Sequence, residues 1–294
     1  MATFAKSTFS AASYASFRPS YPASLYNAVL AYHCGPKRLC LDLGCGTGIV
    51  TREMGKHFDR IIGTDPSAGM IKQARSSIDS GKQYANIEFQ EGSAESTPSI
   101  GDGEADMVVA GQAAHWFDHG KLWPEMKRLV RKDGTVAFWG YKDHVFVDFP
   151  EATEIMQKYA YDPHPDMLGS YWPMPGRSYV QDKLRIIQPP SSDWEDVQRV
   201  EYEPATKGKR SGEGTIFMER SLTVGETKEY VRTWSSFHGW QETHPERKAR
   251  SKGGEGDIMD EMFDRIAERT EHFREEGNVV SIEWGSGLVM ARRK

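Results

Sequence analysis

A single stretch, LCLDLGCGTGIVTREM at residues 39–54, constrains the fold of this chain more than any other. Its apolar run stops at Asp42 and gives way to three glycines at alternate positions, Gly44, Gly46 and Gly48. Glycines in this arrangement allow a ligand to approach the backbone where a strand turns into a helix. The stretch therefore predicts a strand, a ligand-binding turn and then a helix.

Short apolar segments alternate with amphipathic ones along the first half of the chain. Strands are predicted at 39–43, 60–64, 87–90, 105–110 and 135–139, and helices at 23–33, 48–57, 67–78 and about 119–131. Repeated alternation of strand and helix is typical of a doubly wound α/β sheet with right-handed crossovers. We therefore expect an α/β fold with a Rossmann-like, mostly parallel sheet.

The alternation ends after Tyr141, and the remaining elements are fewer. Residues 203–214 have the composition of an exposed loop. One helix is predicted to begin at the capping box of Thr223 and Glu226 and to continue through residue 240, and another covers about 256–275.

The last segment, NVVSIEWGSGLVMARRK at 278–294, predicts two strands around a Gly-Ser-Gly turn. A tight turn makes two strands antiparallel. The sheet is therefore expected to finish with an antiparallel hairpin at its edge.

Composition excludes several classes of protein. At 294 residues with 38% hydrophobic and 27% charged residues, the chain is typical of globular proteins. Its net charge of −5 gives no electrostatic case for nucleic acid or anionic membrane, and no apolar run approaches the ~20 residues of a spanning helix. The three cysteines fit neither a disulfide framework nor zinc spacing, and no signal-peptide hydrophobic region is present. We expect a reduced, cytoplasmic protein without a bound metal.

The glycine turn can be assigned by elimination. A phosphate-binding P-loop needs a lysine that is absent here. A dinucleotide site needs a third glycine or alanine where Ile49 or Thr51 stands, and Asp42 would repel a pyrophosphate. S-adenosylmethionine (SAM) remains, because its ammonium group suits Asp42, directly or through water. Asp65 lies 21 residues after Gly44 at the end of the second strand, where a carboxylate can bind ribose hydroxyls.

Four segments in order now resemble a known family. LDLGCGTG, GTDPSAGM, EGSAE and ADMVVAGQAAHW are similar to the successive motifs of class I SAM-dependent methyltransferases. The resemblance implies SAM as cofactor and S-adenosylhomocysteine (SAH) as product. The implied cofactor-binding residues are Asp42, Gly44, Gly46, Gly48, Asp65, Pro66, Met70, Ser93, Ala94, Glu95 and Gly111, with Tyr14 and Tyr21 from the N-terminal segment.

Five further segments resemble the fungal-type trans-aconitate methyltransferase family. They are SYASFRPSYP, AAHWFD, FWGYKD, GSYWPMPGRSYV and YVRTWSSFHGW, and with them the resemblance covers almost the whole chain. It implies methyl transfer to one carboxylate of a small acid, giving a monomethyl ester. The implied organisation is one domain, with a covering segment at 1–22, a SAM-binding core at 39–141, a region at 142–275 that is mostly cap, and the closing hairpin at 278–294.

The substrate-binding candidates follow from the chemistry of a polyanionic acceptor. Arginine is preferred for forked contact with carboxylates, and an ionised carboxylate needs no general base. The candidates are Arg18, Arg177 and Arg232 for the charges, His115 for a hydrogen bond, and Trp116, Trp139, Tyr141 and Trp172 for the pocket wall. With a phenol or thiol acceptor, His115 would instead be a possible general base.

Two alternatives stay open at this stage. The chain could be an O-, N- or S-methyltransferase of secondary or xenobiotic metabolism, because the fold does not name the substrate. It could also be a regulatory protein that binds SAM without turnover. In each case the partner is a small molecule, and neither nucleic acid nor membrane is expected.

Overall fold

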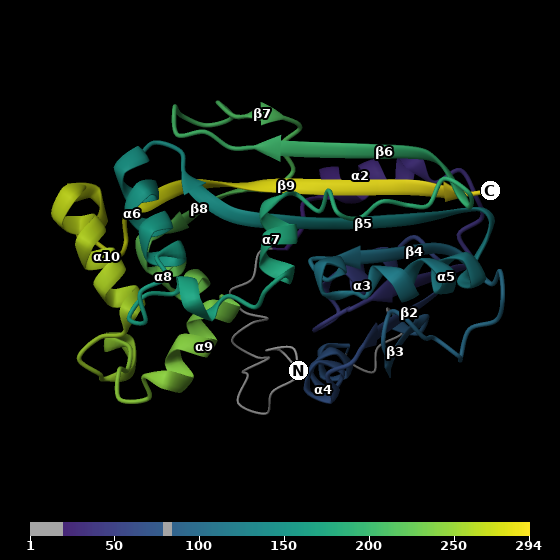
Figure 1. Ribbon diagram of the computed structural model, residues 1–294, viewed down its shortest axis with the longest axis horizontal. Helices are drawn as coiled ribbons and strands as arrows, with labels where there is room; N and C mark the ends of the chain where they lie inside the picture. Colours follow the sequence, from purple (N-terminus) through teal and green to yellow (C-terminus); the bar gives the residue numbers. More distant parts are fainter. Residues whose placement is uncertain (1–19, 79–83) are drawn as a thin grey trace. The chain divides into compact units, whose positions relative to one another are not determined.

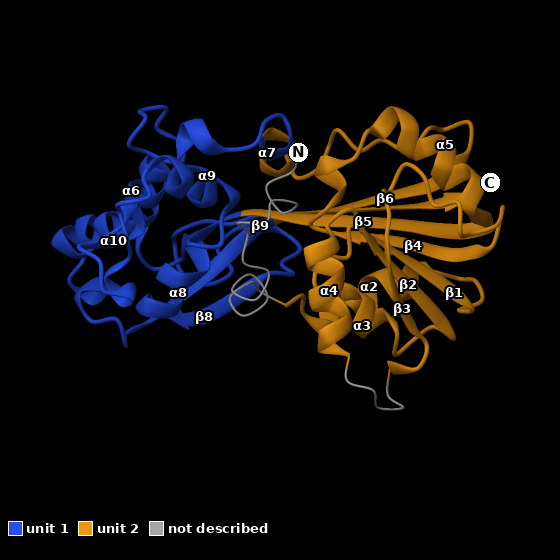
Figure 2. Ribbon diagram, turned by 90° about the horizontal axis from the view of Figure 1, so that it is seen from below, with its two compact units in different colours: residues 1–19, 143–177, 202–285 blue, residues 20–142, 178–201, 286–294 orange. Residues whose placement is uncertain are grey.

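The computed structural model describes residues 20–78 and 84–294, and Figure 1 shows its helices and strands. Tyr14 and Arg18 lie outside the described residues. The chain divides into two compact units, coloured separately in Figure 2. Of the described residues, unit 1 comprises 143–177 and 202–285, and unit 2 comprises 20–78, 84–142, 178–201 and 286–294.

Unit 2 contains the predicted alternation of strands and helices. Its elements are α2 (Ala23–Tyr32), β1 (Leu39–Leu43), α3 (Ile49–Met54), β2 (Arg60–Asp65), α4 (Ala68–Ser77), β3 (Ile87–Glu91), β4 (Ala105–Gly111), η3 (Ala114–Trp116), α5 (His119–Leu129) and most of β5 (Val130–Phe146). Strands β1 to β5 are parallel in the order β3-β2-β1-β4-β5. The expected Rossmann-like α/β sheet is confirmed.

The central strands are apolar because both faces of the sheet are covered. Every residue of β1 is buried, and β4 is buried up to its last residue. Figure 2 shows α5 on one side of this sheet and α2 and α3 on the other. Buried parallel strands of this kind read as continuous hydrophobic runs, which is why the sequence revealed them.

Strand β9 (Val279–Arg293) corrects the prediction for the C-terminal segment. It lies between β5 and β6 (Trp194–Glu203) and runs opposite to both (Figure 1), so the antiparallel addition is confirmed. The prediction of a tight turn is wrong, however, because one strand continues through the Gly-Ser-Gly sequence. A Cβ atom at Gly287 would collide with the backbone of Lys183. This glycine therefore permits close backbone approach inside a strand instead of a turn.

Unit 1 contains most of the elements that the sequence described poorly. They are α6 (Pro150–Tyr161), η4 (Gly169–Tyr171), β7 (Glu213–Gly214), β8 (Glu219–Thr223), α8 (Val224–Val231), α9 (Ser235–Thr243), η5 (Arg250–Lys252), α10 (Ile258–Arg269) and η6 (Glu271–Arg274), while α7 (Gly176–Gln181) crosses the boundary between the units. The capping box of Thr223 and Glu226 is confirmed at the start of α8. The single helix predicted beyond it is two helices, and the predicted loop at 203–214 includes β7, paired with the end of β6.

No helix in the described part of the chain is both long enough and apolar enough to cross a membrane.

Candidate active site

The three glycines of the predicted turn have different structural roles. All three have positive φ, at +65° for Gly44, +54° for Gly46 and +82° for Gly48. A Cβ atom would lie 2.5 Å from Ala113 Cβ at the first position and 2.5 Å from Phe89 Cζ at the third. At Gly46 it would meet no atom within 4 Å. The first and third glycines therefore serve close packing, and the second faces open space where a ligand can approach.

Asp42 is a buried carboxylate that is only half satisfied. Its side chain lies at the end of β1, and Oδ2 accepts a hydrogen bond of 2.6 Å from the Thr51 hydroxyl. Oδ1 is buried and has no hydrogen-bond partner among the described residues. Burial raises the pKa of Asp42 to about 7, and the charge of Asp65 acts in the same direction. A cationic group would satisfy the remaining oxygen and favour the ionised form.

Asp65 holds the glycine turn itself, which the sequence did not indicate. Its Oδ2 accepts from the Gly46 N–H at 3.0 Å, and its Oδ1 accepts from the Ser67 N–H at 2.9 Å. Burial raises the pKa of Asp65, while these two N–H groups oppose the shift. Each carboxylate oxygen retains a second lone pair, so the ribose contact stays a prediction.

The predicted adenine side is built mainly from residues with structural contacts. Glu95 Oε1 accepts from the Asp118 N–H at 2.8 Å, next to the N-terminus of α5. Ala94 and Met70 are buried, and Ser93 forms an isolated bridge with Ser96. The roles of Pro66, Met70, Ser93, Ala94 and Glu95 toward the cofactor stay predictions.

A wall of aromatic rings is formed by Tyr21, Tyr26, Trp139 and Tyr141. The ring centroid of Tyr21 lies 5.6 Å from that of Trp139 and 6.3 Å from those of Tyr26 and Tyr141. The Trp139 Nε1–H is buried without a hydrogen-bond partner among the described residues. This indole lies beside Gly111, where a Cβ atom would come within 3.1 Å of its Nε1. The wall therefore adjoins the end of β4.

His115 and Trp116 also follow β4, as the sequence predicted. Both belong to η3, and their ring centroids are 4.7 Å apart. His115 is buried. Their contact with a substrate stays a prediction.

Arg177 lies in unit 1 with an acidic partner of its own. Its guanidinium lies over the Trp172 ring, 3.9 Å from the centroid, and 5.5 Å from that of Tyr161. Its Nη2 donates to Asp143 and to the Tyr161 hydroxyl. Its Nε is buried and has no partner among the described residues. Sequence reasoning missed both partners: Asp143 lies in the segment FWGYKD, but nothing there marks it as a partner of Arg177, and Tyr161 carries no motif signal.

Arg232 is neutralised within unit 1. Its guanidinium is almost fully buried and forms ion pairs with Asp257 at 2.8 Å, Asp260 at 2.9 Å and Glu229 at 2.5 Å. Asp257 and Asp260 also form the capping box of α10. These contacts favour a structural role for Arg232 over one in binding the acceptor.

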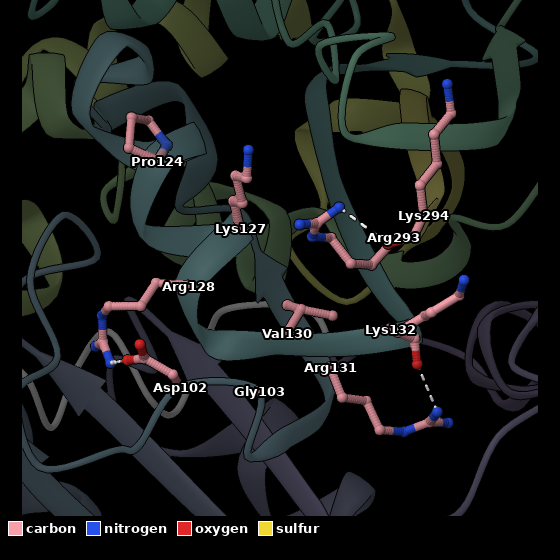
Figure 3. Close-up of a pocket in the computed structure, with 10 residues that line it drawn as sticks. All are labelled: Asp102, Gly103, Pro124, Lys127, Arg128, Val130, Arg131, Lys132, Arg293 and Lys294. Carbon is pink, nitrogen blue, oxygen red and sulfur yellow. Dashed lines mark hydrogen bonds and ion pairs between the residues drawn. The ribbon is translucent and has the colours of Figure 1, made fainter.

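A groove of about 520 Å³ lies at the opposite edge of the sheet, where β4 and β5 begin. Figure 3 shows the six basic side chains that line it, Lys127, Arg128, Arg131, Lys132, Arg293 and Lys294. Asp193 lies 2.7 Å from Lys127 and 4.0 Å from Arg293, and Arg128 pairs with Asp102 and Glu125. Because the chain's own acids balance much of this charge, the groove is not a candidate active site.

The site at the carboxyl edge fits a cofactor with a cationic amino-acid end. Asp42 Oδ1 and Trp139 Nε1 are buried polar atoms without partners in the described part of the chain, and Gly46 borders open space. Open α/β sheets bind their ligands at this edge. Fold and site together have the features expected of an enzyme that binds SAM, as the class I methyltransferases do.

Comparison with known proteins gives the family. A family model described as "Methyltransferase domain" matches residues 41–138. CRG1 of Saccharomyces cerevisiae, described as a probable SAM-dependent methyltransferase, is 30% identical over 99% of this chain and 98% of its own length. A candidate methyltransferase of Dictyostelium discoideum is 25% identical, covering 96% of this chain and 92% of its own. This chain belongs to the class I SAM-dependent methyltransferases, and SAM is its cofactor.

A solved structure supports the fold. A protein of Anaeromyxobacter dehalogenans described as a candidate type II methyltransferase superposes with a TM-score of 0.67 at 22% identity, covering 94% of this chain and 98% of that one. When bound, SAM supplies an electrophilic methyl group for transfer to a small acceptor molecule.

Proposed function

We propose that this chain methylates a carboxylate of a small polycarboxylic acid, with trans-aconitate as the preferred acceptor, to give a methyl ester and SAH. The observation that carries the proposal is Arg177, a guanidinium held against aromatic rings with its Nε unpartnered in the described part of the chain. Guanidinium groups in such surroundings bind planar carboxylates well.

The contacts of Arg177 leave its Nε–H for an acceptor. Asp143 and Tyr161 occupy Nη2, whereas Nε has no described partner. The rings of Tyr161 and Trp172 stack with centroids 6.1 Å apart. This combination suits an unsaturated acid, whose flat carbon skeleton can contact the rings while an oxygen accepts from Nε.

With a carboxylate as acceptor, the reaction needs no general base. The carboxylate is ionised at neutral pH and is already the nucleophile, so the chain's residues need only bind, orient and exclude water. In this reaction His115 would hydrogen-bond the acceptor without taking its proton.

The chain's three cysteines are free thiols, and we propose the cytoplasm as its location.

One observation favours a second candidate, the methylation of a neutral hydroxyl, amine or thiol. Asp143 balances the charge of Arg177, and three carboxylates surround Arg232. A site with balanced charge attracts a polyanion less strongly. In that case His115 would be the possible general base.

Steady-state kinetics on trans-aconitate and on a panel of phenols, amines and thiols tests the proposal. We expect Arg177→Gln to lower kcat/KM for trans-aconitate by roughly 30-fold to several thousand-fold, because a desolvated partner of the acceptor is lost. Arg177→Lys should restore little of the lost kcat/KM, since lysine keeps the charge but lacks the forked donors of a guanidinium. SAM affinity should not change, and Arg250→Gln, which removes an exposed ion pair with Asp264, is the matched control.

The pH profile separates the two candidates. A carboxylate acceptor should give a chemical step that is nearly flat from about pH 6 to 8, with His115→Asn affecting mainly KM. A rate that rises about tenfold per pH unit and is lost with His115→Asn would support the neutral acceptor. Binding of SAM with no transfer to any of these acceptors would instead support a regulatory protein.

A further inference from the structure

Gln112 has an unusual backbone conformation at the cofactor edge of the sheet. It directly follows β4, and its φ of +55° is in the left-handed region that non-glycine residues rarely adopt. Residues held in such conformations persist only where surrounding contacts determine them, and they cluster at functional sites.

The side chain of Gln112 extends the pairing of β4 and β5 beyond the last strand residue. The regular register ends at Gly111 opposite Trp139, and the Gln112 N–H then donates to the Trp139 carbonyl at 2.8 Å. The side-chain Nε2 donates to the Tyr141 carbonyl at 2.9 Å, and Oε1 accepts from the Tyr141 N–H at 2.6 Å. One amide thus satisfies both backbone groups of Tyr141, as a strand residue would.

Gly140 makes this arrangement possible. A Cβ atom at position 140 would lie 2.9 Å from Gln112 Oε1, which is too close for an ordinary contact. The left-handed residue, the adjacent glycine and the paired hydrogen bonds are therefore parts of one feature.

The segment that Gln112 holds carries the aromatic wall. Trp139 and Tyr141 both pack against Tyr21, with ring centroids at 5.6 Å and 6.3 Å. Trp139 also lies beside Gly111, at the edge where the cofactor binds. A shift of the backbone at Tyr141 would move its ring away from this wall.

We propose that Gln112 is a positioning residue for SAM binding, which acts through Tyr141 and holds its ring toward the sulfonium end of the cofactor. Aromatic faces attract cations, and SAM carries a sulfonium charge that SAH lacks. The positioning therefore matters more for SAM than for SAH. This role concerns the cofactor and is independent of the acceptor proposed above.

Calorimetric titration of Gln112→Leu with SAM and with SAH provides the test. We expect SAM to bind about 10- to 100-fold more weakly, the range known for removing a group that orients a metal ligand, and SAH to lose clearly less. Gln198→Leu is the matched control, because that glutamine makes an exposed bond of 3.3 Å to Asp196 on β6. It should change neither affinity.

A double-mutant cycle separates positioning from general stability. Tyr141→Ala leaves the backbone groups that Gln112 contacts, so Gln112→Leu in that background should weaken SAM binding by less than about threefold. Equal losses for SAM and SAH, or the full loss in the Tyr141→Ala background, would overturn the proposal and leave a structural role. If Gln112→Leu does not fold, Gln112→Glu serves in its place, since it keeps the acceptor for the Tyr141 N–H and loses the donor to its carbonyl.

Discussion

The Asp42 carboxylate of unit 2 and the Arg232 guanidinium of unit 1 are both buried charged groups, but they differ in how far their hydrogen bonds are satisfied. Asp42 keeps one buried oxygen without a described partner, whereas Arg232 is surrounded by three carboxylates. Buried polar groups are normally satisfied, so an unsatisfied one requires an explanation such as a ligand. The structure therefore favours a stabilising role for Arg232, and the binding role of Asp42 stays a prediction, although both are charged residues in motif-like surroundings.

The largest effect is expected from breaking the satisfied cluster. Arg232→Gln should lower the free energy of unfolding by about 3–5 kcal/mol, because it leaves Asp257 buried without its cation and leaves Asp260 with Lys228 alone, at 3.6 Å. Denaturant unfolding at pH 7 measures this. Arg250→Gln should cost less than about 1 kcal/mol, since its pair with Asp264 is half exposed on both sides. If the Arg232→Gln variant is as stable as the wild type but does not bind the acceptor, then Arg232 is a substrate-binding residue and not a structural one.

Asp42 and Asp260 should affect the pH dependence of the free energy of unfolding in opposite directions. The folded-state pKa of Asp42 is raised to about 7, above its ordinary 3.8, so between these values the folded protein binds more protons than the unfolded one. The contribution of Asp42 to stability therefore falls as pH rises from about 4 to 7, by up to about 4 kcal/mol. Asp260 acts oppositely. Its pKa is lowered to about 2, so its contribution is lost as pH falls below 4.

Thermal unfolding of Asp42→Asn and wild type from pH 4 to 8, both without cofactor, measures the first contribution. The free energy of unfolding should change less between pH 4 and pH 8 in Asp42→Asn than in the wild type. Adding SAM should reduce this change in the wild type only. Parallel curves for the two proteins would mean that Asp42 titrates normally.

Asp65 should show an intermediate effect on binding. Asp65→Ala is expected to weaken SAM binding by roughly 1.5–3 kcal/mol, because a charged acceptor for two ribose hydroxyls is lost and the Gly46 N–H is released. Calorimetric titration with SAM and SAH measures it, and both ligands should lose equally since they share the ribose. Unchanged affinity in a folded variant would limit Asp65 to holding the turn.

The smallest effect is expected at the open glycine. Gly46→Ala should cost about 1 kcal/mol of stability, the penalty of a left-handed alanine, because no atom lies within 4 Å of the added Cβ. Gly44→Ala should cost more, since its Cβ would lie 2.5 Å from that of Ala113. Thermal unfolding of both variants compares them. If Gly46→Ala is the less stable, then the assignment of packing and binding roles to these glycines is reversed.

Several parts of the sequence defined their structure locally. Buried parallel strands are continuous apolar runs, so β1 and β4 were visible without tertiary information. The capping box of Thr223 and Glu226 was visible because its contacts span three residues. The glycine turn likewise predicted that a ligand approaches the backbone there, and the order of the motifs indicated SAM.

Other features depended on contacts between distant residues. The Gly-Ser-Gly sequence in β9 resembled a turn, and only the backbone of Lys183 shows why Gly287 belongs to a strand. Arg177 and Arg232 looked equivalent as sequence, since nothing near them predicts Asp143, Asp257 or Asp260 as partners. Gln112 lies within the segment ADMVVAGQAAHW, but nothing in that motif indicated its role, because the role arises from a left-handed backbone and a pair of bonds to Tyr141.

The sequence by itself therefore determined the parallel sheet, which follows from local patterns of burial, and its motifs indicated the family and the cofactor by their resemblance to known proteins. The tertiary structure decided which polar side chains are already satisfied and which are left for a ligand. That distinction depends on groups brought together from positions far apart in the chain, and burial makes each such pairing energetically decisive.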